Sequence, residues 1–574
     1  MNILGIHDGH TATACLVKDG ALMAMVSEER FNRKKSWGGV PTQAAQWVLH
    51  STGTDPRAVD AVAVASLVQP LIEFSGGKMF PPNPLTPLTQ IVPHQLLGAD
   101  ALVSPYSSVM QRRRDIASLH RLMDTLGIPT ARLQMVEHHL AHVAASYYLS
   151  PFAQTPERET LVISLDGSGD GLCCTVNRAQ NFSFKRLLAI PSYHSPGLMY
   201  SLVTQYLGMK PMEHEYKVMG LAPYAPEELA ERARKVFATY LGLSADGLRI
   251  QNMAGAWSAG FADKLARDCQ NMRFDAVAAG MQLRLEEVVV AFIRNWIQHT
   301  GIRTLALGGG VFMNVKLNML LQALPAVEQV FFMPSGGDES IAVGAALQAS
   351  IERGARVIQP LGGLYLGPAF TADEIEATLR QYAGRICWQR VEQVEEKAAE
   401  LLAQGHVLGR CAGRMEWGAR SLGNRSILAD GRDLSVVRKI NAAIKQRDFW
   451  MPFAPSILWE RRHDYLVNPR DADAPYMALA FPSTPLAQDH LKAALHQYDL
   501  TCRPQLVRAQ INPGYYRLLK AWERLTGCGG LLNTSFNLHG EPIVCTPQDA
   551  LETLLRSAID DLLIEDFWVR RVKS

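Results

Sequence analysis

The alternation of hydrophobic and polar positions predicts paired strands at the start of the chain. Hydrophobic residues between positions 3 and 26 fall into three runs, separated by Asp8-Gly9 and by an Asp19-Gly20 turn, and this is the pattern of a β-hairpin. The pattern recurs over residues 161–190, where Asp166-Gly167 takes the position of Asp8-Gly9. A single repeat of this length is not a solenoid. We interpret it as a duplicated α/β unit, with a nucleotide cleft expected between its halves.

Two further strand-to-helix junctions follow the repeat. Residues 304–307 form a hydrophobic run before Gly308-Gly309-Gly310 and a helical stretch that reaches residue 318. Residues 330–333 precede a loop over 334–338 and a helix over 341–351. Backbone amides at such junctions can bind phosphate groups. One glycine triplet has little specificity, so its weight comes from recurrence on a duplicated unit.

A stretch rich in glycine and proline divides the chain. Residues 354–368 are typical of a linker, and Thr371 to Glu374 form a capping box that opens the next helix. We therefore predict two α/β domains, residues 1–357 and 358–574, for which the chain is long enough. Residues 69–105 are dense in proline, leucine and methionine without periodicity, which is typical of a lid or of a disordered segment.

Composition limits the location and the partners. Hydrophobic residues make up 48% of the chain, charged residues 20%, and the net charge is +2, so we expect no binding to nucleic acid or to a membrane surface. The N-terminus lacks the features of a signal peptide, and no apolar stretch reaches ~20 residues. The nine cysteines include no CxxC pair. This favours a reducing cytoplasm and argues against a structural zinc site.

Two histidines and two aspartates are candidate metal ligands. His138 and His142 are four positions apart in an Ala-rich stretch predicted to be helical, so their imidazoles share one face. For an isolated pair, core or capping histidines would be the better interpretation. Asp166 and Asp338, expected at strand ends, shift the balance toward a site that suits Fe(II), Mn(II), Co(II) or Zn(II).

Two other residues of the first domain are candidates for chemistry. His10 lies in the first glycine-containing turn, where it could accept a proton from an attacking hydroxyl. A turn histidine that bonds its own backbone is an equal alternative. Lys217, in the run Glu215–Gly220, is a candidate phosphate contact, and a solvated lysine is the alternative.

Basic residues gather in the second domain. Residues 413–426 hold three arginines among glycines, and Arg503 follows later. Arginine forks match phosphate geometry, and glycine lets the backbone approach a ligand. Lys445 and Arg447, with Ser535 and Asn537, add charged and neutral groups that can bind phosphate and a small planar polar group. Surface salt bridges are the alternative for each arginine taken alone.

Runs along nearly the whole chain resemble the O-carbamoyltransferases of the NodU/CmcH type, which carbamoylate nodulation factors, cephalosporins, aminoglycosides and related natural products. The Lys-x-Arg and Ser-x-Asn pairs resemble the anion-binding tetrad of YrdC-like domains. The order and the spacing of the runs both fit. The runs are Ser27–Phe31, His138–His142, Lys217–Ala222, Gly308–Asn314, Gly418–Gly423, Met451–Pro455 and Asn533–Asn537.

The resemblance implies a two-part enzyme. The N-terminal part would have the duplicated actin/hexokinase/chaperone-type ATPase fold, similar to the tRNA threonylcarbamoyl transferases, and would hold Fe(II) through the four candidate ligands. The C-terminal part would be YrdC-like and would convert carbamoyl phosphate and ATP, the latter with Mg(II), into carbamoyladenylate, releasing phosphate and pyrophosphate. The intermediate would then pass internally to the N-terminal site, where the hydroxyl of a small-molecule acceptor attacks it.

The resemblance also implies roles for individual residues. Lys445 and Arg447 would act in catalysis, and His10, from its place in the first turn, is expected to act with them. One departure is Met451, where the family usually has arginine, and Arg425 or Arg447 could substitute for it. Binding of carbamoyl phosphate and ATP would fall to Arg420, Lys445, Arg447, Arg503, Ser535 and Asn537, and nucleotide binding in the N-terminal part to Lys217, Gly309, Gly310 and Asn314.

Other interpretations fit the sequence less well. An enzyme of tRNA threonylcarbamoyl modification would be expected to carry a basic stripe, and the carbamoyltransferase of hydrogenase maturation carries CxxC zinc motifs. A sugar-kinase-like ATPase leaves the C-terminal tetrad without a role. A non-catalytic binding protein would not need the metal and phosphate residues together. The acceptor and the oligomeric state are not specified by the sequence.

Overall fold

The computed structural model describes residues 1–70, 114–256, 259–445 and 447–572. The chain divides into two compact units: an N-terminal unit of Met1–Glu28 and Ser36–Leu361, and a C-terminal unit of Glu29–Lys35 and Gly362–Ser574. The stretch interpreted as a lid, 69–105, lies almost entirely outside the described residues. Among the described helices, none combines the length and the apolar character that crossing a bilayer requires.

The first sheet of the N-terminal unit has the strand order β3-β2-β1-β4-β5. β1, β2 and β3 are antiparallel neighbours, as the alternation of residues 3–26 predicts, whereas β4 and β5 run parallel to β1. Every residue of β4 is buried, which is expected of a strand covered on both faces. The strands are β1 (Asn2–His7), β2 (Thr13–Lys18), β3 (Ala21–Ser27), β4 (Ala61–Ala65) and β5 (Leu133–Val136).

The second sheet repeats this arrangement with the order β8-β7-β6-β11-β12. Again three consecutive strands are antiparallel, and the last two run parallel to the first of them. The shared order and polarity confirm the duplicated α/β unit that the repeat predicts, of the actin/hexokinase type that the resemblance implies. The strands are β6 (Thr160–Gly169), β7 (Leu172–Gln180), β8 (Ser183–Pro191), β11 (Thr304–Gly308) and β12 (Gln329–Phe332).

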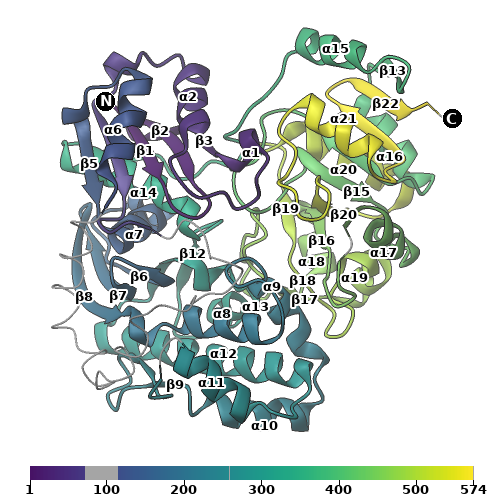
Figure 1. Cartoon of the computed structure of the whole chain (residues 1–574). Helices are drawn as coiled ribbons and strands as arrows, with labels where there is room; N and C mark the ends of the chain where they lie inside the picture. The colour runs from purple at the N-terminus through teal and green to yellow at the C-terminus, as the bar shows by residue number, and fades with distance from the viewer. Residues whose placement is uncertain (71–113, 257–258, 446, 573–574) are drawn as a thin grey trace. The chain divides into compact units, whose positions relative to one another are not determined.

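Two helices pack against each other between the sheets (Figure 1). α7 (His138–Tyr148) packs on β6 and β11 of the second sheet, and α14 (Ile341–Glu352) packs on β1 and β4 of the first. Their backbones approach closely, because a Cβ added at Gly344 would lie 1.8 Å from the carbonyl oxygen of Ala141. Only glycine fits at such a contact. Each half of the duplicated unit therefore contributes a helix to the other half.

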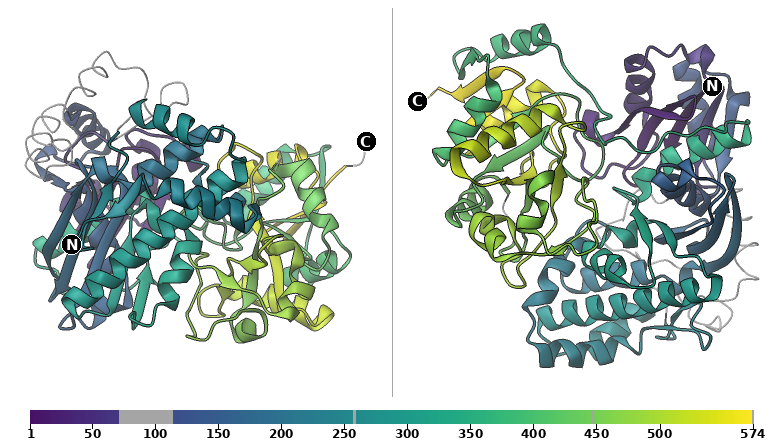
Figure 2. Two further views of the ribbon diagram at one scale, coloured as in Figure 1. Left: turned by 90° about the horizontal axis from the view of Figure 1, so that it is seen from below. Right: turned by 180° about the vertical axis from the view of Figure 1, so that it is seen from behind.

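A helical layer completes the N-terminal unit (Figure 2). Its long helix α12 (Phe274–Thr300) packs against α8 (Pro196–Tyr206), α9 (Glu215–Leu221), α10 (Glu227–Phe237) and α13 (Val315–Ala323). The other elements of the unit are α2 (Thr42–Ser51), α6 (Ile116–Leu126), α11 (Ala259–Asp268) and the ribbon of β9 (Leu241–Leu243) and β10 (Ile250–Asn252).

The C-terminal unit is built on a mixed sheet of eight strands, in the order β13-β22-β21-β14-β15-β20-β16-β19. β14, β15 and β20 are antiparallel neighbours, so β14 and β20 end at the same edge of the sheet. The strands are β13 (Ile386–Arg390), β14 (Leu408–Cys411), β15 (Arg425–Ala429), β16 (Ala454–Leu458), β19 (Gln505–Val507), β20 (Gly530–Ser535), β21 (Asp561–Ile564) and β22 (Phe567–Arg571); β17 (Phe481–Pro482) and β18 (Thr501–Cys502) form a separate ribbon.

Helices cover this sheet, and one core joins Ile375 and Leu379 of α15 to Ile427 and Leu532 of the strands. Thr371 and Glu374 make both bonds of the capping box that the sequence predicts at the start of α15. A short helix from early in the chain, α1 (Glu29–Asn32), also belongs to this unit. The helices are α15 (Ala372–Gln381), α16 (Val394–Ala403), α17 (Ser435–Ile440), α18 (Arg462–Tyr465), α19 (Pro485–His490), α20 (Pro513–Thr526) and α21 (Pro547–Leu555).

Candidate metal site and anion-binding cluster

The first turns of α7 carry both candidate histidine ligands. The helix starts at His138, where the side chain of Glu137 caps it by accepting a hydrogen bond from the amide of Leu140. His138 and His142 are buried, at 2% and 1% exposure, with ring centroids 4.8 Å apart. The hydroxyl of Ser66 lies 3.0 Å from Nδ1 of His138 and fixes the ring, so that Nε2 points away from it.

Four side chains converge here, as the sequence predicts. Nε2 of His138 lies 3.5 Å from Oδ2 of Asp166 and 3.7 Å from Oδ1 of Asp338, and Nε2 of His142 lies 3.6 Å from the same Asp338 oxygen. One ligand atom from each residue lies within 4.8 Å of the others. Neither Nε2 atom has a hydrogen-bond partner among the described residues, although both are buried. Two imidazoles and two carboxylates around buried, unpartnered nitrogens fit a divalent cation.

The two aspartates reach the site from irregular backbone. Asp166 was expected to end its strand, but β6 continues to Gly169 after a register irregularity that begins at Leu165. Asp338 was also expected at a strand end, whereas it opens a 3-10 turn (Asp338–Ser340) six residues after β12. The amide of Gly310 donates to Oδ1 of Asp166 at 2.7 Å, which leaves Oδ2 facing His138. Both corrections come from local backbone that departs from a regular strand, which periodicity does not register.

Charge at the site favours a cation. Burial raises the pKa of Asp166, but the adjacent imidazole of His138 and the charge of His142 outweigh it and hold that pKa far below its usual range. Burial lowers the pKa of His138, yet Asp338 and then Asp166 raise it to about 9. The two carboxylates therefore stabilise a positive charge at the imidazoles. A metal ion bound at this site would displace the proton of His138.

The equivalent aspartate of the first repeat has a different environment. Asp8 forms a buried ion pair with Arg114 at 2.8 Å, and both side chains are almost fully enclosed. It is therefore already neutralised and lies outside the metal cluster. His7, at the end of β1, was missed by sequence analysis. Burial lowers the pKa of His7, and the charge of Asp338 offsets only part of that effect. The only signal for His7 in the sequence was its place at the end of a buried strand.

The other predicted residues of the N-terminal unit lie in three different settings. His10 lies in the turn between β1 and β2, where its carbonyl accepts a hydrogen bond from Nε2 of His7 at 3.1 Å. Gly309 has φ of 101°, a conformation that favours glycine, and directs the amide of Gly310 to Asp166. Asn314 caps α13 and bonds to Gln282, which accounts for its side chain structurally. Lys217 lies in α9, half-buried.

In the C-terminal unit, Lys445 lies at the centre of the predicted tetrad. It ends a π-helical turn after α17 and is buried, at 3% exposure. Its ammonium donates to Oγ of Ser535 at 3.1 Å, to Oδ1 of Asn537 at 2.5 Å and to both backbone carbonyls. No carboxylate pairs with it among the described residues. Burial, and then the positive charges of Arg447 and Lys35, hold the pKa of Lys445 well below its usual value.

Three arginines add to this positive charge. Burial lowers the pKa of Arg503, and the neighbouring charges of Arg420 and Arg447 lower it further, so the three guanidinium groups lie close together. Nη1 of Arg503 is buried without a hydrogen-bond partner among the described residues. Arg447 donates to Oγ1 of Thr534 at 3.2 Å and stacks on Phe453. We call Arg420, Lys445, Arg447 and Arg503 the basic cluster.

Arg425 does not belong to the basic cluster, although it was one of two expected substitutes for the arginine that Met451 replaces. It is buried, at 1% exposure. Its guanidinium donates to the backbone carbonyls of Pro368, Ala412, Gly413, Asn424 and Cys545. The donors of Arg425 are therefore occupied by the protein's own carbonyls. Of the two expected substitutes, Arg447 is the one that belongs to the basic cluster.

A segment from early in the chain supports this region, and sequence analysis missed it. Arg30 of α1 is buried and donates to the carbonyl of Gly418, two residues before Arg420. Arg33 donates to the carbonyls of Pro542 and Ile543. These contacts place Glu29–Lys35 in the C-terminal unit, where the charge of Lys35 reaches Lys445. Periodicity carries no information about pairs so distant in sequence.

Two family models match the chain. Residues 2–347 match the family described as Carbamoyltransferase N-terminus, and residues 399–571 match Carbamoyltransferase C-terminus. A solved relative, the ROK hexokinase from Thermus thermophilus, covers 62% of this chain and 100% of its own at 13% identity, with a TM-score of 0.31. The duplicated fold rests on the strand order described above rather than on that likeness.

Relatives at higher identity span the full chain. The uncharacterized protein sll1178 from Synechocystis is 33% identical over 99% of this chain and 96% of its own. The nodulation protein NolNO from Sinorhizobium fredii is 31% identical over 99% of this chain and 79% of its own. Both family matches lie on the chain in the expected order. The protein therefore belongs to the carbamoyltransferase family and is a carbamoyltransferase.

Proposed function

We propose that this carbamoyltransferase uses ATP and works in two steps, one in each unit. The observation that carries the proposal is the basic cluster, which holds at least two cationic groups, Lys445 and Arg503, without a carboxylate partner among the described residues. Burying unpaired charge costs several kcal/mol. Such a cluster is kept where an anionic ligand neutralises it, and phosphate groups match arginine and lysine donors.

The first step is formation of carbamoyladenylate in the C-terminal unit. Water cleaves carbamoyl phosphate into carbamate and inorganic phosphate, and an oxygen of the carbamate then attacks the α-phosphorus of ATP. A new P–O bond forms, the bond to the β-phosphate breaks, and pyrophosphate leaves. Arg447 and Arg503 would bind the phosphate oxygens. Lys445, which donates to Ser535 and Asn537, would lie between the phosphate and these two residues, whose neutral groups can orient the carbamoyl group.

The N-terminal unit carries the transfer step. Its four converging side chains, His138, His142, Asp166 and Asp338, would hold one divalent cation, of which Fe(II) is our expectation. A cation bound there supplies Lewis-acid stabilisation to a phosphate oxygen. Gly310 orients the Asp166 carboxylate through its amide, and Ser66 fixes the His138 ring. These contacts set the ligand geometry in advance.

Transfer itself needs an acceptor hydroxyl and a base. The hydroxyl oxygen attacks the carbamoyl carbon, a C–O bond forms, and AMP departs with the electrons of the broken bond. His10 would receive the hydroxyl proton. We propose a small natural product as the acceptor, since the net charge of +2 gives no basis for binding nucleic acid and a full-length relative is named a nodulation protein.

An acceptor-free reaction tests the first step. We expect the full-length protein with ATP, Mg(II) and carbamoyl phosphate to give pyrophosphate and a carbamoyladenylate mass. Arg447→Ala should lower the rate by roughly 10- to 100-fold, because a hydrogen bond to a charged group is worth about 1.5–3 kcal/mol. Arg380→Ala, which removes an exposed arginine paired with Glu376 in the same unit, is the matched control and should keep the rate. Release of ADP without pyrophosphate would instead identify a kinase.

A further inference from the structure

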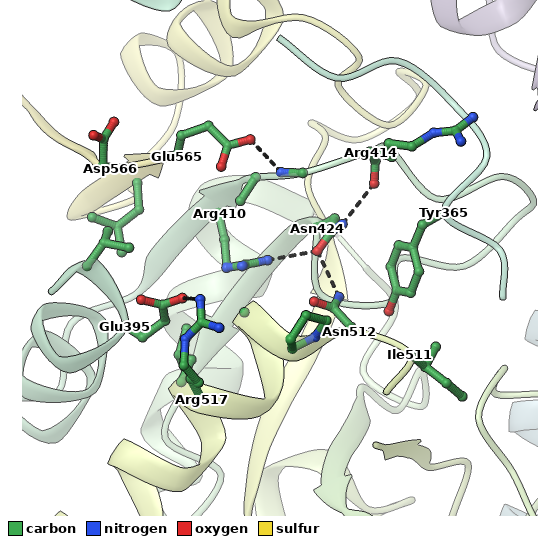
Figure 3. A pocket seen from close by; sticks show the side chains of 17 residues that line it. Tyr365, Glu395, Arg410, Arg414, Asn424, Ile511, Asn512, Arg517, Glu565 and Asp566 are labelled. Carbon is green, nitrogen blue, oxygen red and sulfur yellow. Dashed lines mark hydrogen bonds and ion pairs between the residues drawn. The ribbon is translucent and has the colours of Figure 1, made fainter. Parts of the chain in front are cut away.

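The C-terminal unit contains a cavity at the start of α20 (Figure 3). Its volume is about 530 Å³, within the range of small-molecule pockets. Arg410 of β14 and Gly514 of α20 line its polar side. None of its lining residues belongs to the basic cluster, and neither Ser535 nor Asn537 is among them. Its apolar lining includes Val394, Ile511, Leu518 and Leu563.

Arg410 brings a buried positive charge to this cavity. Its side chain is 7% exposed, stacks on Tyr515 and uses Nη1 to donate to the carbonyl of Gly423 at 2.7 Å and to Oδ1 of Asn424 at 2.9 Å. Nε and Nη2 donate to no described residue, and no described carboxylate forms an ion pair with the guanidinium. Two strong donors on a buried cation are therefore left for a ligand.

The start of α20 adds a third donor beside them. Asn512 caps the helix by accepting from the amide of Tyr515 at 3.1 Å, and Pro513 has no amide hydrogen. The amide of Gly514 makes no hydrogen bond to a described residue. A Cβ added at Gly514 would lie 3.3 Å from Nη2 of Arg410, so the two groups adjoin. The positive end of the helix dipole also faces this point.

The carboxylates around the cavity already have their own partners. Glu395 pairs with Arg517 at 2.6 Å, and Asp566 pairs with Arg390 at 2.5 Å. Glu565 accepts from the amide of Gly413 at 2.6 Å. Figure 3 shows Glu395 turned to Arg517, while Arg410 reaches toward Asn424. Glu565 and Glu395 act on Arg410 through their charge, but neither forms an ion pair with its guanidinium.

We propose that this cavity binds a small organic anion, separate from the nucleotide and carbamoyl phosphate of the proposed reaction. Its carboxylate or phosphate group would accept hydrogen bonds from Nη2 of Arg410 and the amide of Gly514. Its body would lie against Leu518 and Leu563. The built features that recognise it are a buried guanidinium, an open helix amide and a glycine that leaves room between them.

The test uses Gly514→Asp in the full-length protein. An aspartate early in a helix is favourable, so the variant should fold, and its carboxylate would occupy the space beside Arg410. Calorimetric titrations with inorganic phosphate and with malonate are run in an Arg447→Ala background, which weakens the other anion site. We expect one site for at least one probe, and the tighter probe identifies the anionic group.

Gly514→Asp should weaken that binding at least tenfold, whereas Gly514→Ala should retain more of it. Pyrophosphate release by Gly514→Asp, measured without the Arg447 change, should stay near the wild-type rate, which separates this proposal from the proposed function. Absence of binding by both probes, or equal binding by wild type and Gly514→Asp, would overturn the second anion site.

Discussion

The two units hold clusters of opposite character. In the N-terminal unit, two buried imidazole nitrogens and two carboxylates converge. In the C-terminal unit, a buried ammonium and neighbouring guanidinium groups converge, and no described carboxylate pairs with Lys445 or Arg503. Unpaired buried groups are costly, so each set indicates the charge of what it binds. From this contrast we infer that the N-terminal unit binds a divalent cation and that the C-terminal unit binds phosphate groups.

The largest change in rate should come from substituting His10. This substitution tests whether carbamoyl transfer takes place in the unit that holds the metal cluster. A positioned base is worth roughly 10²–10⁴-fold. We expect His10→Ala to form carbamoyladenylate normally and to transfer it slower by that factor. The measurement is carbamoyl transfer from supplied carbamoyladenylate to whichever compound in a panel of sugars, polyols and amino sugars the wild type modifies.

His120→Ala is the control for that experiment, because it removes an exposed histidine of α6 in the same unit. Transfer by His10→Ala at the wild-type rate would show that His10 only closes the turn after β1.

The second prediction tests metal binding by the N-terminal unit. His138→Ala/His142→Ala removes two of four ligands and should reduce bound metal from about one ion per chain to a trace, measured by elemental analysis. A ligand present at 100 times its dissociation constant stabilises a protein by about 2.7 kcal/mol. Chelation should therefore lower the unfolding temperature of wild type and leave that of the double variant unchanged. Full metal content in the double variant would refute the assignment.

The smallest expected effect is a change in stability at the basic cluster of the C-terminal unit. Nη1 of Arg503 has no hydrogen-bond partner among the described residues, whereas the Arg425 guanidinium donates to five carbonyls. Arg503→Met should stabilise the ligand-free protein by about 1 kcal/mol, or raise its melting temperature by roughly 2–4 °C, while lowering adenylate formation. Arg425→Met should destabilise by about 3 kcal/mol, because carbonyls lose their donors. Thermal unfolding of both variants decides this, and destabilisation by Arg503→Met would contradict an unpaired charge.

Much of the fold could be predicted from local pattern. The alternation at residues 3–26 and its recurrence at 161–190 specify paired strands, and their shared topology follows from the repeat. The capping box at Thr371 is a local signal and was found. The insertion of Glu29–Lys35 into the C-terminal unit was not, because it depends on contacts such as Arg30 with Gly418 that have no sequence periodicity.

The sites divide in the same way. The spacing of His138 and His142 places both rings on one helical face, and the structure brings Asp166 and Asp338 to them. The repeat also suggested that Asp8 and Asp166 are equivalent, yet Asp8 is neutralised by Arg114 from a distant segment. Whether an aspartate binds an ion or an arginine depends on tertiary packing, and a single sequence does not show it.

We propose that adenylate formation takes place in the C-terminal unit and that metal-dependent transfer takes place in the N-terminal unit. Pyrophosphate release by His138→Ala/His142→Ala, with ATP, Mg(II) and carbamoyl phosphate but no acceptor, tests it most directly. Circular dichroism should first show that the variant is folded. We predict release near the wild-type rate, because the basic cluster contains none of the metal ligands. Loss of pyrophosphate release in this folded variant would contradict the division of labour between the two units.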